Sequence, residues 1–163
     1  MAMSRRKIRE HIFKLLFNLD FYTGEEDDLQ VDLYFREMTP QEQEEKGLLS
    51  ETWYALRFLA DEDADIPEYA SDEERAYIAD KVKGICRKLP EIDEEIGKVS
   101  KGWKVSRMPK TDLAILRLAV YEIRFDEEVP EKVAVNEAVE LAKRYGSDDS
   151  PSFINGVLSR FVS

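Results

Sequence analysis

The chain has 163 residues, 43% of them hydrophobic, a net charge of −11 and a single cysteine, Cys86. This length and apolar content suffice for one domain, or two small helical halves, with a hydrophobic core, while one cysteine excludes an internal disulfide. With no secretory signal at the N-terminus and no apolar run near the ~20 residues of a membrane span, we expect a soluble, cytoplasmic protein that does not enter a membrane.

The charge is distributed unevenly along the sequence. Residues 1–19 carry five basic groups and one acid, a net charge of +4, whereas residues 20–95 carry 8 basic and 24 acidic groups, a net charge of −16. An evenly acidic chain would repel nucleic acid, but a basic N-terminal segment on an acidic protein indicates a local binding site for an anion.

Apolar residues at helical spacing predict a first helix over about residues 4–19, with Ser4 as its N-cap. The predicted apolar stripe consists of Ile8, Ile12, Leu15, Leu16 and Leu19. At about 100° per residue, Arg6, Glu10, Phe13 and Phe17 fall on roughly the opposite face. We therefore expect two aromatic side chains to share a face with an arginine instead of entering the core.

The middle of the chain, residues 23–75, is acid-rich and interrupted by prolines and a glycine, with residues 48–59 as a possible helix. Paired carboxylates for acid–base catalysis would need burial, which such dense charge opposes. The composition therefore indicates solvated faces and loops.

A helix resumes near Glu73, and Pro90 marks a turn or the start of the next helix. The inward-facing side chains of these two segments are predicted to be Ile78, Val82, Ile85, Leu89, Ile92 and Ile96. Basic residues then recur at every third position, namely Lys98, Lys101, Lys104, Arg107 and Lys110. This series is either a second basic strip for an anion or the solvated flank of a helix that ends near Gly102.

Two long helices are predicted in the C-terminal part. The first begins at Lys110 or Thr111 and is apolar around most of its circumference as far as Ile123, which indicates a buried, central helix. The second covers about residues 132–145 and is stopped by Gly146.

The last helix is predicted to open at Ser150 as N-cap, with Pro151 at N1. Gly156 within it costs about 1 kcal/mol relative to alanine, which suggests the close approach of another helix or of a ligand. Because helical periodicity dominates the sequence and no alternating strand pattern is evident, we predict an all-α fold.

The sequence offers little to build an enzyme site from. One histidine, one cysteine and seven glycines cannot supply a zinc site of four His or Cys ligands, and the glycines form neither a Walker A loop nor a dinucleotide-binding fingerprint. His11 lies beside the apolar stripe and has no evident Ser or Cys partner to activate, so we assign it to packing or to the surface. We expect no metal, no cofactor and no enzymatic activity.

A long segment near the C-terminus carries a specific signature. It contains Trp103, Arg107, Met108 and Asp112, then residues 115–122 (ILRLAVYE), 129–130 (VP), 132–143 (KVAVNEAVELAK), Ser150 and residues 153–158 (FINGVL). This segment resembles the bacterial transcription antitermination factors of the NusB family, and residues 5–10 (RRKIRE), with Leu16 and Phe17, resemble that family's opening helix. Residues 23–75 depart from the family pattern.

The resemblance implies a fold of about seven helices in two small packed bundles, here an N-terminal subdomain over residues 1–89 and a C-terminal subdomain over residues 90–163. It also implies a function. Proteins of this family bind the boxA element of nascent ribosomal-operon RNA together with NusE, a small-subunit ribosomal protein. The complex helps RNA polymerase to read through terminators, so the expected partners are single-stranded RNA, NusE and the antitermination complex.

The same resemblance assigns site residues. The expected RNA-binding residues are Arg5, Arg6, Lys7, Arg9, Phe17, Asp149, Ser150 and Phe153. Arginines neutralise phosphates and aromatic rings stack on unpaired bases, which agrees with a basic, aromatic-bearing helix. Phe17 has packing against another helix as its competing interpretation, and for Phe13 the sequence leaves open whether it packs in the core or faces RNA. The free amides at the start of the last helix suit a phosphate or a base acceptor.

Asp112 matches a position near the NusE interface of the family, although a negative charge at the start of a helix explains it equally well. Arg117, Glu122, Asn136 and Glu137 are expected to tie helices together through polar contacts.

Two other classes of protein remain as alternatives. A NusB-like domain also precedes certain RNA cytosine methyltransferases, but these continue into a catalytic domain with a glycine-rich loop, which the sequence to Ser163 does not contain. The other alternative is a purely protein-binding helical module whose acidic surface meets a basic ribosomal-type partner. A homodimer is compatible with the sequence as well.

Overall fold

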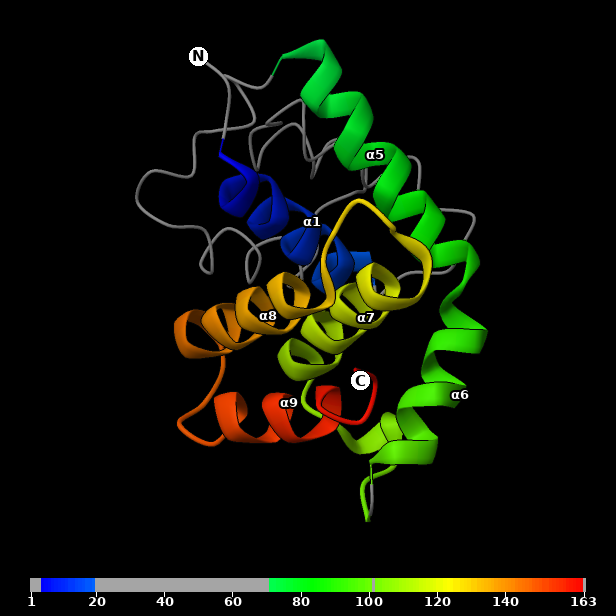
Figure 1. Ribbon diagram of the computed structural model, residues 1–163, viewed down its shortest axis with the longest axis vertical. Helices are drawn as coiled ribbons and strands as arrows, with labels where there is room; N and C mark the ends of the chain where they lie inside the picture. Colours follow the sequence, from blue (N-terminus) through cyan, green and yellow to red (C-terminus); the bar gives the residue numbers. More distant parts are fainter. Residues whose placement is uncertain (1–3, 20–70, 101, 163) are drawn as a thin grey trace, which may run out of the picture. The chain divides into compact units, whose positions relative to one another are not determined.

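The computed structural model describes residues 4–19, 71–100 and 102–162. These residues form six α-helices and one 3-10 helix without a strand, which confirms the predicted all-α class for this part of the chain (Figure 1). The chain separates into two compact units, Met1–Lys83 and Gly84–Ser163, and the division falls inside a helix rather than after residue 89. The possible helix at 48–59 lies outside the described residues.

Helix α1 spans Arg5–Leu19, where the sequence predicted it. Its first turn is capped by Ser4, whose hydroxyl accepts the Lys7 backbone N–H at 3.1 Å. Solvent-accessible side chains are confined to the start of the helix, because every residue from position 10 to 17 is buried. The accessible part of α1 is therefore its start, residues 5–9.

Phe13 and Phe17 do not share an exposed face with Arg6, since their side chains are only 0% and 8% exposed. Phe13 is a core residue, which confirms its packing interpretation, whereas the expected exposure of Phe17 is wrong. Helical periodicity correctly predicts an exposed face if the helix packs against the protein on one side alone. From its second turn α1 is covered on all sides, so the face opposite the apolar stripe is buried as well.

Helix α5 covers Asp72–Arg87 and begins with a capping box. The Glu74 N–H donates to the Ser71 hydroxyl at 3.1 Å, and the Ser71 N–H donates to the Glu74 carboxylate at 3.0 Å. The side chains of Ile78, Val82, Ile85, Ile92 and Ile96 are all 0% exposed, as predicted. Leu89 was predicted to face inward too, but its side chain is only partly buried. It is the first residue of helix α6, which spans Leu89–Val99 and has Pro90 in its first turn.

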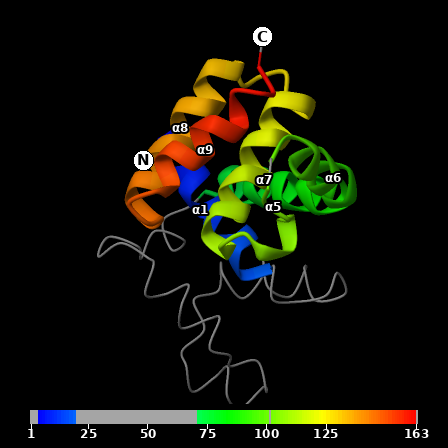
Figure 2. The same cartoon turned by 90° about the horizontal axis from the view of Figure 1, so that it is seen from below.

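The second unit is organised around helix α7, Lys110–Phe125, which packs against α6, against α8 (Glu131–Tyr145) and against α9 (Ser150–Leu158) (Figures 1 and 2). Nine of the 16 residues of α7 are buried, which confirms that it is the central helix. Arg117 joins α7 to α6, because its guanidinium donates two hydrogen bonds, of 2.9 and 2.8 Å, to the Asp93 carboxylate.

Helix α8 stops at Gly146, as predicted, but for a different reason from the expected one. The φ angle of Gly146 is −90°, so no left-handed conformation requires glycine here. A Cβ atom at this position would lie 2.6 Å from the Ser150 side chain and 2.8 Å from the Ala142 carbonyl oxygen. Close approach of the turn to α9 therefore excludes a side chain at Gly146. None of the helices in the described ranges is both long and apolar enough to cross a membrane.

Candidate functional site

The accessible start of α1 is basic. Arg5 and Arg6 are exposed, and Lys7 and Arg9 are partly buried; we call these four residues the basic end of α1. Lys14, by contrast, is 1% exposed and contributes nothing to the surface. Cations at a helix N-terminus oppose the helix dipole, so helix stability does not explain their position. The basic side chains would attract an anion, and backbone amides at a helix N-terminus can donate to one.

The Lys7 ammonium lies 3.5 Å from the Glu10 carboxylate, and no acidic residue occupies the first turn of α1. One charge of the basic end is thus partly neutralised within the helix. By sequence, residues 4–9 carry four basic groups and no acid, in a chain whose net charge is −11.

His11 follows the basic end and is buried, with 1% of its side chain exposed. Burial, with smaller contributions from the charges of Lys14 and Lys7, lowers the pKa of His11 from 6.5 to about 3. The imidazole is neutral at physiological pH and is enclosed by protein. It is a packing residue rather than part of an accessible site.

The two polar residues assigned to different partners, Asp112 and Ser150, contact each other. The Ser150 hydroxyl donates to the Asp112 carboxylate at 2.7 Å, and both side chains are at least 95% buried. The same hydroxyl accepts the Ser147 backbone N–H at 3.0 Å. This pair joins the first turn of α7 to the first turn of α9.

The prediction that Ser150 is the N-cap of the last helix is wrong. The N-cap is Asp149, and its side chain makes no capping hydrogen bond. The Ser150 hydroxyl is directed to the buried carboxylate of Asp112 instead of to the amides of its own helix. Asp149 is exposed and Phe153 is partly exposed, so these two of the expected residues at this helix end reach solvent.

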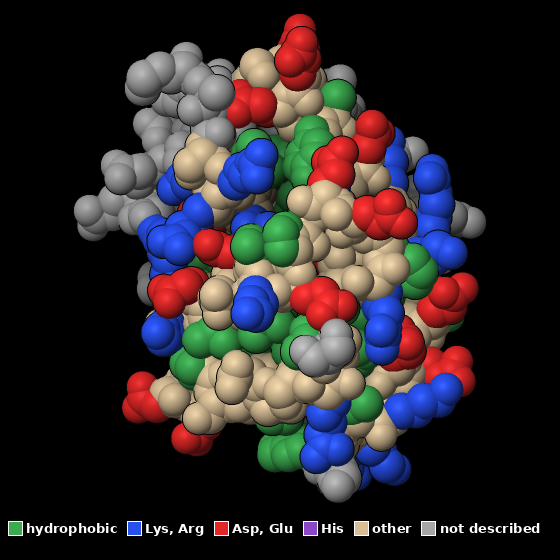
Figure 3. All heavy atoms as spheres, in the orientation of Figure 1, with side chains coloured by type: hydrophobic (Ala, Val, Ile, Leu, Met, Phe, Trp, Pro, Cys, Tyr) green, Lys and Arg blue, Asp and Glu red, His purple; other side chains and the backbone are tan. Residues whose placement is uncertain are grey.

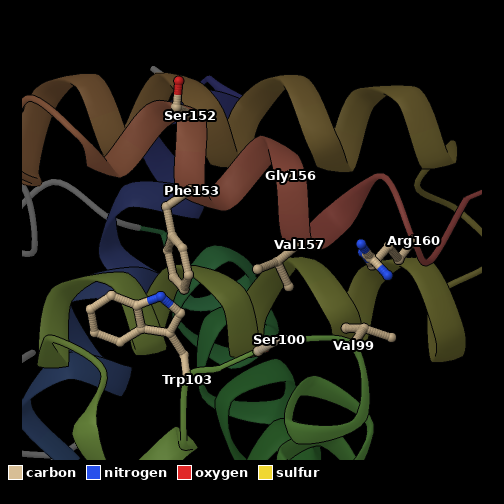
Figure 4. A pocket seen from close by; sticks show the side chains of 8 residues that line it. All are labelled: Val99, Ser100, Trp103, Ser152, Phe153, Gly156, Val157 and Arg160. Atoms are coloured by element: carbon tan, nitrogen blue, oxygen red, sulfur yellow. The ribbon is translucent and has the colours of Figure 1, made fainter.

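A pocket of about 300 Å³ lies beside Phe153 in the second unit (Figure 4). It is lined by Val99, Ser100, Trp103, Ser152, Phe153, Gly156, Val157 and Arg160. Figure 4 shows Phe153 and Val157 extending from α9 toward the segment that holds Trp103 and Ser100, whereas Ser152 points away. The Trp103 and Phe153 rings meet edge to face, with their centroids 5.9 Å apart.

Sequence reasoning did not assign Trp103 or Arg160 to a site. Trp103 follows Ile92 and Ile96 at helical spacing and therefore resembles a further core residue. However, α6 ends at Val99, and Gly102 has a φ of +80°, a conformation that favours glycine. The chain changes direction there, and the Trp103 side chain is 52% exposed. Gly102, directly before Trp103, is the feature of the sequence from which the end of the helix could have been predicted.

The basic residues at every third position from Lys98 to Lys110 do not all form one exposed cationic strip. Lys98 lies 3.4 Å from the Glu94 carboxylate one turn earlier, as expected for a solvated helix flank. Figure 3 shows basic and acidic side chains interleaved at its lower right, where α6 lies. Lys104 and Arg107 are exposed on the segment after Trp103, and Lys101 lies outside the described residues.

Gly156 was expected to face another helix or a ligand. No atom lies within 4 Å of the position of a Cβ there, so no helix requires this glycine. The residue instead borders the open pocket. Elsewhere in the described part of the chain, no group of three or more His, Cys, Asp or Glu side chains is placed to hold a metal ion.

These features define a small all-helical protein with a basic helix end and an aromatic pocket. Comparison with known proteins gives the family. The model of the NusB family matches residues 56–163. The transcription antitermination proteins NusB of Agathobacter rectalis and Lachnoclostridium phytofermentans are each 42% identical over 160 residues, which cover 98% of this chain and 100% and 99% of those proteins.

A solved structure of T. maritima NusB has a TM-score of 0.67 and 28% sequence identity, and the match covers 99% of this chain and 92% of that one. The chain therefore belongs to the NusB family, whose members are transcription antitermination proteins and not enzymes. The resemblance seen in the C-terminal signature is thereby confirmed.

Proposed function

We propose that this protein binds boxA-type single-stranded RNA of ribosomal operons jointly with NusE, as part of the antitermination complex on cytoplasmic RNA polymerase. The basic end of α1 carries the proposal. It places four basic side chains on accessible helix turns of a protein that is otherwise acidic, which is the electrostatic requirement for holding an RNA backbone.

The start of α9 supplies the second part of the proposed RNA surface, through Asp149, Ser150 and Phe153. Phe153 offers a partly exposed ring for a base, and the backbone amides of the first turn can hold an acceptor. Ser150 acts through its backbone, because its hydroxyl is engaged by Asp112. Phe17 is too deeply buried to offer a stacking face, so we leave it out of this surface.

The decisive experiment is a fluorescence anisotropy titration of a boxA RNA with this protein, alone and with NusE. We expect binding that tightens when NusE is present and that exceeds the binding of a scrambled RNA of equal length. If NusE binds but neither the protein nor the complex retains RNA, the chain is a protein-binding module that recognises a basic ribosomal partner.

Replacing Arg6 and Arg9 together by alanine should weaken RNA binding without unfolding the protein. Each lost contact to a single-stranded phosphate lowers the slope of log affinity against log salt by about 0.7, so the double variant should lose about 1.4. Anisotropy titrations over a series of salt concentrations measure this slope. Arg87→Ala, which removes an exposed arginine at the end of α5, is the matched control. An unchanged slope in the double variant would remove α1 from the RNA surface.

Asp149→Asn should strengthen RNA binding. The exposed carboxylate of Asp149 stands at a helix end where we place RNA, and two unit charges about 6 Å apart in water repel by about 0.7 kcal/mol, which corresponds to about threefold in affinity. The gain should shrink at high salt, because the Debye length falls from about 10 Å at 0.1 M to about 3 Å at 1 M. Titrations at low and high salt test this, with Glu127→Gln as an equal charge change elsewhere. Equal affinities for Asp149→Asn and wild type at low salt would contradict it.

A further inference from the structure

We propose that the pocket between Trp103 and Phe153 holds one unstacked base of the bound single-stranded RNA, with Trp103 as the stacking surface and Arg160 as the contact to the adjacent phosphate. This inference rests on the proposed function and extends the RNA path beyond the start of α9. It assigns roles to Trp103, Gly156 and Arg160, which no feature of the core requires.

The aromatic geometry suits a planar ligand. Trp103 leaves half of its surface exposed, at 52%, although an indole of this size is normally largely buried. The Phe153 ring contacts the indole edge to face, with the ring centroids 5.9 Å apart, and about half of the Trp103 surface remains accessible to a third ring. Figure 4 shows the two side chains converging from α9 and from the segment after α6, at one end of the pocket.

The charge of the pocket suits a nucleotide. Arg160 is the only charged residue in the lining, and no carboxylate lines the pocket of a protein with 35 acidic and 24 basic residues. The Arg160 side chain is exposed and forms no ion pair with any residue in the described ranges. Lys104 and Arg107, both exposed, follow Trp103 directly along the chain. An anion beside the pocket would meet these cations without displacing an existing ion pair of Arg160.

Gly156 gives an independent argument. Glycine destabilises a helix interior relative to alanine, and here neither a neighbouring atom nor a positive φ requires it. Its effect is to keep the floor of the pocket free of a side chain. A ligand that approaches the backbone of α9 provides the physical reason for this glycine.

The size of the pocket selects among aromatic ligands. Its volume of about 300 Å³ lies at the lower limit for small-molecule sites, so it admits a single planar group and not an amphipathic helix. A base with its phosphate uses both the ring surface and the cation. An aromatic side chain of a partner protein would use the ring surface alone.

The test is a double-mutant cycle between the protein and the RNA. The probe is the boxA RNA, and each nucleotide in turn is replaced by an abasic ribose, which removes a base but keeps the phosphate. Trp103→Ala should weaken binding of the parent RNA by about 5- to 150-fold, the range for one stacked base, while Trp103→Phe should retain most of the affinity. On the RNA that lacks the base held in the pocket, Trp103→Ala should have no further effect.

Two controls separate stacking from a change of fold. Phe125→Ala removes another exposed aromatic ring of the same unit, 38% exposed, and should leave RNA affinity unchanged. Gly156→Leu should raise the melting temperature yet weaken RNA binding, which misfolding cannot do. Asn155→Leu, an exposed position on the same helix outside the pocket lining, should leave RNA affinity unchanged.

The outcomes distinguish this inference from the proposed function. If the wild type binds boxA RNA but Trp103→Ala has no effect, or the same effect on every abasic RNA, the pocket does not hold a base and the proposed function stands. If Trp103→Ala weakens NusE binding and not RNA binding, the pocket is a protein site and the inference is wrong. If the wild type binds no RNA with or without NusE, both proposals fail.

Discussion

Acidification from pH 6.5 to about pH 4 is expected to lower the free energy of unfolding by about 3 kcal/mol through His11 alone. Burial and two nearby lysines lower the pKa of this imidazole to about 3 in the folded protein, whereas its ordinary pKa is 6.5. Between these two values the unfolded chain binds a proton that the folded protein does not bind. The full stability is therefore present above pH 6.5 and is lost as the pH falls toward 3.

Urea unfolding at a series of pH values measures this effect, with His11→Gln as the comparison. Carboxylates titrate in the same range in both proteins, so the quantity of interest is the difference between the two pH profiles. Because the chain has one histidine, that difference belongs to His11. The substitution can lower stability at every pH without affecting the test, which depends on the slope. Parallel profiles for wild type and variant would contradict the assignment.

Asp112→Ala is expected to destabilise the protein by about 2 to 3 kcal/mol. It removes the charged acceptor of a buried hydrogen bond, and with it a negative charge in the first turn of α7. Asp112→Asn keeps an acceptor oxygen and should lose less. Asp148→Ala, an exposed acid in the turn before α9, should change the free energy of unfolding by less than about 0.5 kcal/mol. Chemical denaturation of the four proteins gives the comparison.

The same variants test the proposed role of Asp112 in NusE binding. If Asp112 acts by joining α7 to α9, Asp112→Asn should bind NusE as wild type does once it is folded. If NusE affinity falls in a well-folded Asp112→Asn protein while RNA affinity is retained, the carboxylate contributes to the partner surface. Asp112→Lys, which reverses the charge, should then weaken NusE binding further.

The sequence by itself determined the all-α class, the ends of the described helices to within a few residues and the family of the protein. Helix formation depends on neighbours three and four residues apart and on start signals such as the Ser4 cap and Pro90 in the first turn of α6, so the information is local. The basic end of α1 was also readable, because it is a property of consecutive residues.

Only the tertiary structure decided which faces are covered and which distant side chains meet. Phe13 and Phe17 belong to the core because α1 is enclosed on all sides from its second turn, which its own periodicity could not reveal. The Asp112–Ser150 hydrogen bond and the Trp103–Phe153 contact each join segments far apart in the chain. Such contacts depend on how α6, α7 and α9 pack against one another, and the spacing of apolar residues within each helix does not determine that packing.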